Sequence, residues 1–225
     1  MEFESKTVKP NRDQVMQTLR NVLPGVNLWE KAHFFKIPVQ WGQKRNKGWV
    51  GQTIERLAGL SLSSDAAPDG HDFELKTTTL ILREGLWIPK ETLKITQLNP
   101  QYILEEEFST SLLWKKLERL VLVGCCQYSP SRVEAIKISS ITISNPALIQ
   151  ELRAFWEDVR HLVCSGEIKS HINLGTSNSL LQLRPLGDGK QRSQCPITGE
   201  FFPARAFYAT KKLINLLMQS EDLGG

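Results

Sequence analysis

A continuous apolar run in the middle of the chain is the feature that most restricts the fold. Residues 120–126 read LVLVGCC and contain no charged side chain. Such a run predicts a central β-strand, because a strand in the middle of a layered fold is covered on both faces. The chain has 225 residues, of which 40% are hydrophobic and 23% charged, so it can bury a core of normal size within one domain.

A second informative stretch, residues 72–80, alternates between polar and apolar side chains. On a strand, alternate side chains share a face, so Asp72, Glu74 and Lys76 point the same way. The loop that leads into this strand contains Asp69, which can fold back over the polar face. The opposite face points into the core with Phe73 and Leu75. The sequence therefore predicts several carboxylates and one lysine in one place.

This group has the chemistry of a metal-dependent nuclease. Carboxylates held together repel one another unless a cation lies between them, and oxygen ligands favour Mg²⁺, Mn²⁺ or Ca²⁺ over zinc. A lysine on the same face can stabilise a developing anion or orient an attacking water. Metal-dependent nucleases use an aspartate followed by Glu-x-Lys to hydrolyse phosphodiesters. The alternative is a solvated strand face, on which this pattern is also common.

A helix predicted over residues 47–59 adds a further carboxylate. Its apolar stripe is followed by Gly59 as a plausible stop. Glu55 lies next to this stripe and can approach the strand that follows. Alone, Glu55 would be interpreted as a surface residue; its position before the acidic group makes it a candidate. The residues of the stripe are Val50, Ile54, Leu57 and Ala58.

The other elements follow from hydrophobic period and from caps. Asn145 is a plausible N-cap and Pro146 a first helical residue for the clearest helix, which runs to Gly166. Residues 91–98 alternate and are expected to form a long hairpin with residues 72–80. We expect a single domain, with a catalytic lobe at 11–145 and a recognition lobe at 146–218. The remaining predictions are helices over 11–23, 28–35, 111–119 and 203–218, and strands over 133–143 and 180–185.

Charge and cysteine content restrict the partners. The net charge of +4 permits a nucleic-acid partner, and basic residues gather at 44–47 and 211–212, although for either group alone a solvated face is the better explanation. The cysteines, Cys125, Cys126, Cys164 and Cys195, have no Cys-x-x-Cys spacing and are expected to be buried free thiols. No apolar run approaches the length of a membrane span, and the first residues lack a signal-peptide pattern, so we expect an intracellular protein.

Several of these blocks, in this order, resemble the MutH-like DNA endonuclease family, which joins a mismatch-repair nicking enzyme with type II restriction enzymes. They are KRNKGWVG at 44–51, Glu55, Asp69 and ELKT at 74–77, followed by PKET at 89–92, LQLRP at 181–185 and FYATKK at 207–212. The resemblance covers roughly residues 11–218. It implies an α/β fold, a restriction-endonuclease-like mixed sheet flanked by helices, in two lobes that form a DNA-binding cleft. It also implies a bacterial, cytoplasmic protein associated with the nucleoid.

The resemblance also implies roles for single residues. Glu55, Asp69 and Glu74 would hold Mg²⁺, with Mn²⁺ as a possible substitute, and Lys76 would assist the attacking water. Asp72 is the alternative to Asp69 as a ligand; Asp69 is preferred because Asp72 lies two residues before Glu74 on the same face. The residues expected to contact DNA are Lys47 at a phosphate, Arg184 in the major groove, Tyr208 beside a base whose methylation is sensed, and Lys211.

The details of the blocks favour one branch of the family. The interval from Asp69 to Glu74 is shorter than in MutH, and Leu186 stands where MutH has a lysine. We therefore predict a Mg²⁺-dependent type II restriction enzyme that cuts double-stranded DNA, with a methyltransferase of the same site as its partner. The alternatives are a strand-nicking endonuclease of methyl-directed mismatch repair, stimulated by an ATPase, and a module that binds DNA without cutting.

Overall fold

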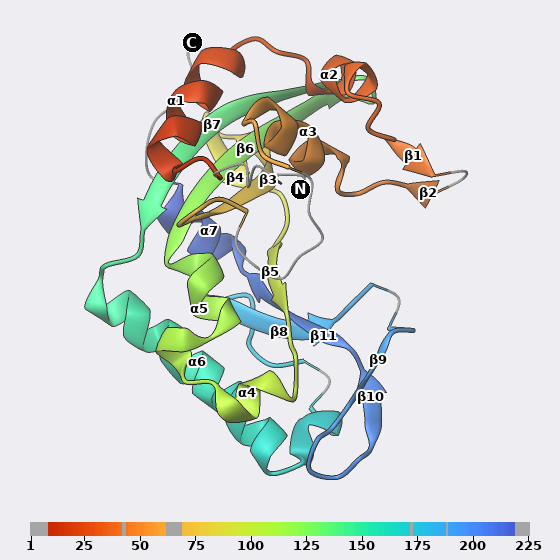
Figure 1. The fold of residues 1–225 in the computed structure, drawn as a ribbon, viewed down its shortest axis with the longest axis vertical. Helices are drawn as coiled ribbons and strands as arrows, with labels where there is room; N and C mark the ends of the chain where they lie inside the picture. Colours follow the sequence, from red (N-terminus) through yellow and green to blue (C-terminus); the bar gives the residue numbers. More distant parts are fainter. Residues whose placement is uncertain (1–8, 42–43, 62–68, 172, 188, 219–225) are drawn as a thin grey trace, which may run out of the picture. The chain divides into compact units, whose positions relative to one another are not determined.

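The computed structural model describes residues 9–41, 44–61, 69–171, 173–187 and 189–218. The chain divides into two compact units, which are interleaved in the sequence. Among the described residues, the first unit contains those up to Leu80 together with Arg119–Ser140, and the second contains Ile81–Glu118 and residues 141–218. The ribbon of Figure 1 labels the elements of both. The expected boundary between lobes at residue 145 stays a prediction.

Three helices of the first unit share one core. They are α1 (Arg12–Val22), α2 (Leu28–Phe34) and α3 (Trp49–Leu57). Asn11 closes a capping box at the start of α1, and Asn27 caps α2. The apolar stripes of the helices are buried together with the inward face of the sheet, where Phe73, Leu75, Val121 and Val123 lie. A short pair of strands, β1 (Gln40–Trp41) and β2 (Lys44–Arg45), precedes α3.

The sheet that carries the acidic group has four strands in the order β4-β3-β6-β7. Strand β3 (Glu74–Arg83) pairs in parallel with β6 (Arg119–Ser129), with Glu74 opposite Leu120 and Thr79 opposite Cys125. Residues 120–125 of β6 are all buried, which confirms the predicted central strand. The remaining strands are β4 (Leu86–Pro89) and β7 (Arg132–Thr142).

The predicted hairpin between residues 72–80 and 91–98 is wrong. The chain turns earlier, at Glu84 and Gly85, which both have positive φ angles, of 50° and 79°. The partner of β3 on that side is therefore β4, while β5 (Leu93–Gln97) belongs to a different sheet. The alternating pattern identified the strand but not its partner, because alternation alone does not specify which strand lies alongside.

The second unit is built on a three-stranded antiparallel sheet in the order β5-β11-β8, with β8 at Leu181–Pro185 and β11 at Arg205–Ala209. The predicted helix over 203–218 is wrong in its first half, because β11 pairs with strands on both sides. Thr210 then caps α7 (Lys211–Leu217), accepting a hydrogen bond from the Leu213 N–H. A shorter pair, β9 (Arg192–Gln194) and β10 (Phe201–Pro203), forms a separate hairpin.

Helix α6 (Pro146–Cys164) is the longest helix of the second unit and begins as predicted. The Asn145 side chain accepts hydrogen bonds from two backbone N–H groups, and Pro146 occupies the first turn. Its buried residues are Leu152, Trp156, Val159, Leu162 and Val163. The smaller helices are α4 (Tyr102–Glu105), η1 (Phe108–Thr110), α5 (Leu112–Leu117) and η2 (Glu167–Lys169).

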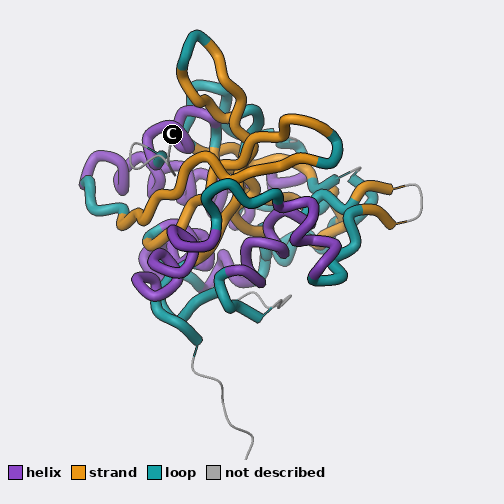
Figure 2. The backbone as a smooth tube through the Cα atoms, turned by 90° about the horizontal axis from the view of Figure 1, so that it is seen from above, coloured by secondary structure: helices purple, strands orange, loops and turns teal. Residues whose placement is uncertain are grey.

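Both units contain helices and strands. Figure 2 colours these helices and strands along the backbone, and together they confirm the predicted α/β class with a mixed sheet and flanking helices. No helix among the described residues is long and apolar enough to cross a membrane. All four cysteines are free thiols. Cys125 and Cys195 are buried as expected, but Cys126 is only half-buried. Cys164 is exposed, because it lies at the end of α6 on the side away from the buried stripe.

Candidate active site and nucleic-acid interface

The start of β3 places two of the predicted site residues next to each other. Glu74 is the first residue of the strand, and its side chain is completely buried. The Lys76 ammonium, on the same face, donates a hydrogen bond to Glu74 Oε1. Asp69, from the preceding loop, accepts a hydrogen bond at 3.0 Å from the Leu75 N–H. The loop aspartate is thus folded back onto the strand that carries Glu74 and Lys76.

Helix α3 brings Glu55 to the same place. The pKa of Glu55 is raised from 4.5 to about 7, first by burial and then by the negative charge of Asp69. Lys76 opposes this shift and Glu74 adds to it, so all four groups lie within electrostatic reach of one another. Glu55 on α3 and the charged residues Glu74 and Lys76 on β3 therefore belong to one polar site.

Sequence reasoning missed Thr77, which follows Lys76 on β3. A Cβ atom placed on Gly51 of α3 would lie 3.6 Å from Thr77 Oγ1 and 3.8 Å from Glu55 Oε1. The hydroxyl and the carboxylate therefore border the same small space beside a glycine. The available signal was the alternation of β3, which puts Thr77 on the face covered by α3.

Asp72, the alternative ligand, is engaged elsewhere. Its Oδ2 atom accepts a hydrogen bond at 2.9 Å from Arg119, the first residue of β6. Asp72 does not contribute to the pKa shift of Glu55, whereas Asp69 does. This ion pair links the segment before β3 with the beginning of β6, so Asp72 has a structural contact of its own.

The donor set fits a hard divalent cation, although its atoms are not arranged around one point. Glu55, Asp69 and Glu74 offer only oxygen atoms, the ligands that Mg²⁺ and Mn²⁺ prefer. In the described ranges, however, no three His, Cys, Asp or Glu side chains are close enough together to hold a metal ion. Glu74 accepts a hydrogen bond from Lys76, and Asp69 accepts one from a backbone N–H.

A second polar group lies on the sheet of the second unit. The Arg184 guanidinium stacks on the Tyr208 ring, with 4.2 Å between Cζ and the ring centroid. Arg184 Nη2 also donates a hydrogen bond at 2.6 Å to Thr92 Oγ1. These contacts hold the guanidinium in one orientation, which is what two-point recognition of a base or phosphate requires.

The two lysines expected at DNA are both exposed. Lys47 lies in the turn just before α3, and Lys211 is the first residue of α7. They belong to different units. Their positions suit contacts with phosphates, since an exposed ammonium on a flexible stem acts as a point charge.

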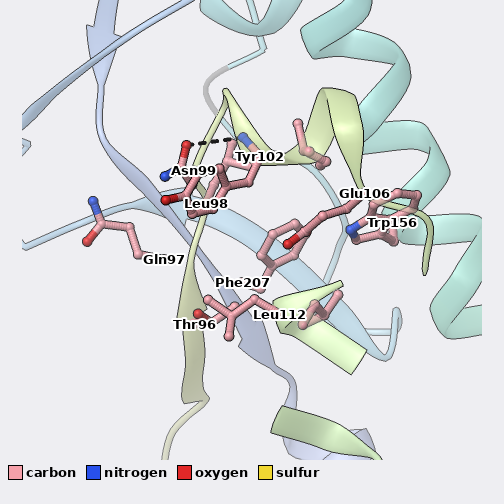
Figure 3. Close-up of a pocket in the computed structure, with 11 residues that line it drawn as sticks. Thr96, Gln97, Leu98, Asn99, Tyr102, Glu106, Leu112, Trp156 and Phe207 are labelled. Atoms are coloured by element: carbon pink, nitrogen blue, oxygen red, sulfur yellow. Dashed lines mark hydrogen bonds between the residues drawn. The ribbon is translucent and has the colours of Figure 1, made fainter. Parts of the chain in front are cut away.

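A pocket in the second unit contains none of the predicted site residues. It lies between β5, α4 and α6, with an apolar floor that includes Trp156 and Phe207. Its rim is polar and includes Gln97, Asn99 and Glu106 (Figure 3). Phe207 is on β11, so the pocket opens over the buried face of the three-stranded sheet.

Clustered carboxylates beside a lysine point to phosphodiester hydrolysis, and a stacked arginine suits nucleic acid, so the class of protein is a DNA endonuclease. The chain belongs to the MutH family. The model of the family described as DNA mismatch repair enzyme MutH matches residues 59–154, which include Asp69, Glu74 and Lys76.

Relatives carrying the name DNA mismatch repair protein MutH match most of the chain. That of Actinobacillus pleuropneumoniae serotype 3 is 31% identical over 171 residues, 74% of each chain. That of Haemophilus ducreyi is 28% identical over 231 residues, 96% of this chain and 99% of the relative. Among solved structures, the restriction endonuclease MvaI in complex with its cognate DNA is similar over 94% of this chain and 96% of its own. The identity is 11% and the TM-score is 0.39.

Proposed function

We propose that this endonuclease nicks one strand of double-stranded DNA in mismatch repair, in place of the type II restriction activity predicted from the sequence. The relatives just described are named as mismatch repair proteins, and two of them match over 74% and 99% of their own length. The argument for restriction rested on the short interval after Asp69 and on Leu186. The short interval and Leu186 leave the set of charged groups at the start of β3 unchanged. They therefore do not outweigh the similarity to relatives that are named as mismatch repair proteins.

The observation that carries the proposal is the convergence of Glu55, Asp69, Glu74 and Lys76 in one unit. Glu55, Asp69 and Glu74 would hold Mg²⁺, which when bound supplies positive charge to the phosphate and favours ionisation of a water. The buried position of Glu74 keeps its carboxylate fixed. The ion pair of Asp72 with Arg119 supports Asp69 as the ligand.

Lys76 complements the charge that builds up on the phosphate during attack. Its ammonium already lies against Glu74, so it is held at the site by an ion pair. A preorganised positive charge of this kind stabilises a transition state without the cost of reorganising solvent.

DNA is bound and read by a second set of residues. Arg184, oriented by Thr92 and Tyr208, contacts base edges, and Lys47 and Lys211 contact phosphates. The phosphate contacts give affinity and orientation, while the base contacts give sequence preference. A mismatch-repair ATPase is the expected protein partner, because nicking must be limited to DNA that carries a mismatch.

Incubation with supercoiled plasmid in Mg²⁺ or in EDTA tests this function. We expect nicked circles that form only with Mg²⁺ and are most abundant on hemimethylated plasmid. Discrete linear fragments from unmethylated plasmid would instead establish a restriction enzyme. Sequence-specific binding with no product in Mg²⁺ or Mn²⁺, with or without the ATPase, would establish a module that binds without cutting.

A further inference from the structure

The three-stranded sheet has one apolar face and one polar face along β8 and β11. The residues of the apolar face are buried: Leu181, Leu183, Phe207 and Ala209. The alternate residues, Gln182, Arg184 and Tyr208, are half-buried. Side chains of a strand alternate between faces, so these polar residues share one surface. Gln182 lies on this surface together with Arg184 and Tyr208, which contact each other.

The register of the sheet places Gln182 beside both Tyr208 and Arg184. Its Cα partner across the antiparallel pair is Tyr208, so their Cβ atoms are about 4.5–5.5 Å apart. Arg184 is two residues further along the same strand and therefore about 6.6–6.8 Å away. Ala206 is the partner of Arg184, and its side chain is completely buried.

Gln182 differs from Arg184 in how its polar atoms are used. The Arg184 guanidinium is held by Thr92 and stacks on Tyr208. The carboxamide of Gln182 has no hydrogen-bond partner within the described part of the chain. Its donor and its acceptor are therefore both available to a ligand on the polar face.

Packing does not account for the polar residues of this face. Gln97 of β5 is the partner of Ala206 on the other side and continues the row. In Figure 3, Gln97 points to the side of β5 away from Phe207 and Trp156, which line the pocket. The buried residues Leu181 and Leu183 of β8 thus lie on one side of the sheet, and Gln182 lies on the other.

We propose that Gln182 is a specificity-determining residue that reads an adenine close to the base contacted by Arg184; this inference rests on the proposed function. A carboxamide pairs with adenine through N6 and N7, as a guanidinium pairs with guanine through O6 and N7. The separation of Gln182 and Arg184 along β8 corresponds to about two base steps of 3.4 Å. Antiparallel strands can enter the major groove and read bases in this way.

A randomised duplex library tests the inference with the full chain, by cleavage in Mg²⁺ and by binding in Ca²⁺. Gln182→Ala is expected to reduce the preference for adenine at one position by about fivefold or more, without changing the others. Gln182→Glu, which can only accept hydrogen bonds, is expected to move that position from adenine towards cytosine. Gln150→Ala is the matched control, because Gln150 is an exposed glutamine on α6 of the same unit.

A purely structural role would give a different pattern. It would lower cleavage of every sequence equally and leave the base preference of both variants unchanged, which would overturn the inference. A wild-type chain without sequence preference in either assay would overturn it as well. Loss of cleavage in Mg²⁺ with an intact binding preference in Ca²⁺ would contradict the proposed function alone, since the change at one position would still be measured by binding.

Discussion

The two polar groups of the molecule are assembled in opposite ways. The acidic group draws Glu55, Asp69, Glu74 and Lys76 from residues 55–76. Its charges interact electrostatically, and Lys76 is paired with Glu74. The polar face of the second sheet joins residues as distant as Thr92 and Tyr208. Arg184 is held there by both of them, whereas the Gln182 side chain has no hydrogen bond to any residue that the structure describes. Charges that interact with one another suit a fixed chemical step, whereas polar side chains spaced along one face of a sheet suit the recognition of particular bases.

The largest expected effect is on cleavage, and it distinguishes the acidic group from the polar face of the second sheet. Asp69→Ala should lower cleavage about a thousandfold or more, because a lost cation ligand removes several kcal/mol of transition-state stabilisation. Binding of DNA, which depends on the other group, should be retained. Cleavage rates on plasmid together with gel-shift affinities measure both. Asp72→Ala is the control, and it should cut at nearly the wild-type rate; a dead Asp72→Ala with an active Asp69→Ala would show that the ligand assignment is reversed.

The second effect belongs to the polar sheet face. Arg184→Ala should lower discrimination at one base pair by about 1–3 kcal/mol, because a two-point contact with a base edge is lost. Arg184→Lys, which keeps the charge but not the planar fork, should lose most of the same discrimination. Cleavage of a set of single-base variants of the preferred site measures this. A uniform loss across all sequences would instead make Arg184 a phosphate contact.

The acidic group should also make stability depend on pH. In the folded chain, burial first and then the charge of Asp69 raise the pKa of Glu55 from 4.5 to about 7. Between these values the folded chain retains a proton that the unfolded chain has released, so the free energy of unfolding should fall as pH rises from about 5 to about 8. Urea unfolding in EDTA measures this slope. Glu55→Gln should flatten it, and an unchanged slope in that variant would assign the effect to another group.

The smallest effect concerns the space beside Gly51. A methyl group there would be in ordinary contact with Thr77 and Glu55, at 3.6 and 3.8 Å. Gly51→Ala should therefore raise the free energy of unfolding by about 0.5–1 kcal/mol, since alanine favours a helix over glycine. If the space is needed by the reaction, the same variant should cut more slowly although it is more stable. Chemical denaturation and cleavage rates of one preparation test both parts, and lower stability would mean that the contact is a clash.

The sequence predicted the acidic group better than the polar sheet face for a physical reason. Glu74 and Lys76 share a face through alternation alone, and the central strand follows from its unbroken apolar run. The partner of a strand is set by turns and register. Because the chain turns early, at Gly85, the expected hairpin between residues 72–80 and 91–98 does not form. Gln182 could not be singled out for the same reason, because only the pairing of β8 with β11 places it opposite Tyr208.

Cutting of one strand only is the central claim, and a doubly labelled duplex tests it most directly. A hemimethylated duplex that carries the preferred site, with a different label on each strand, is incubated with the protein in Mg²⁺ and in EDTA. The account predicts a product from the unmethylated strand alone, formed only in Mg²⁺ and lost in Asp69→Ala. Cutting of both strands at equal rates, or a product that forms in EDTA, would contradict it.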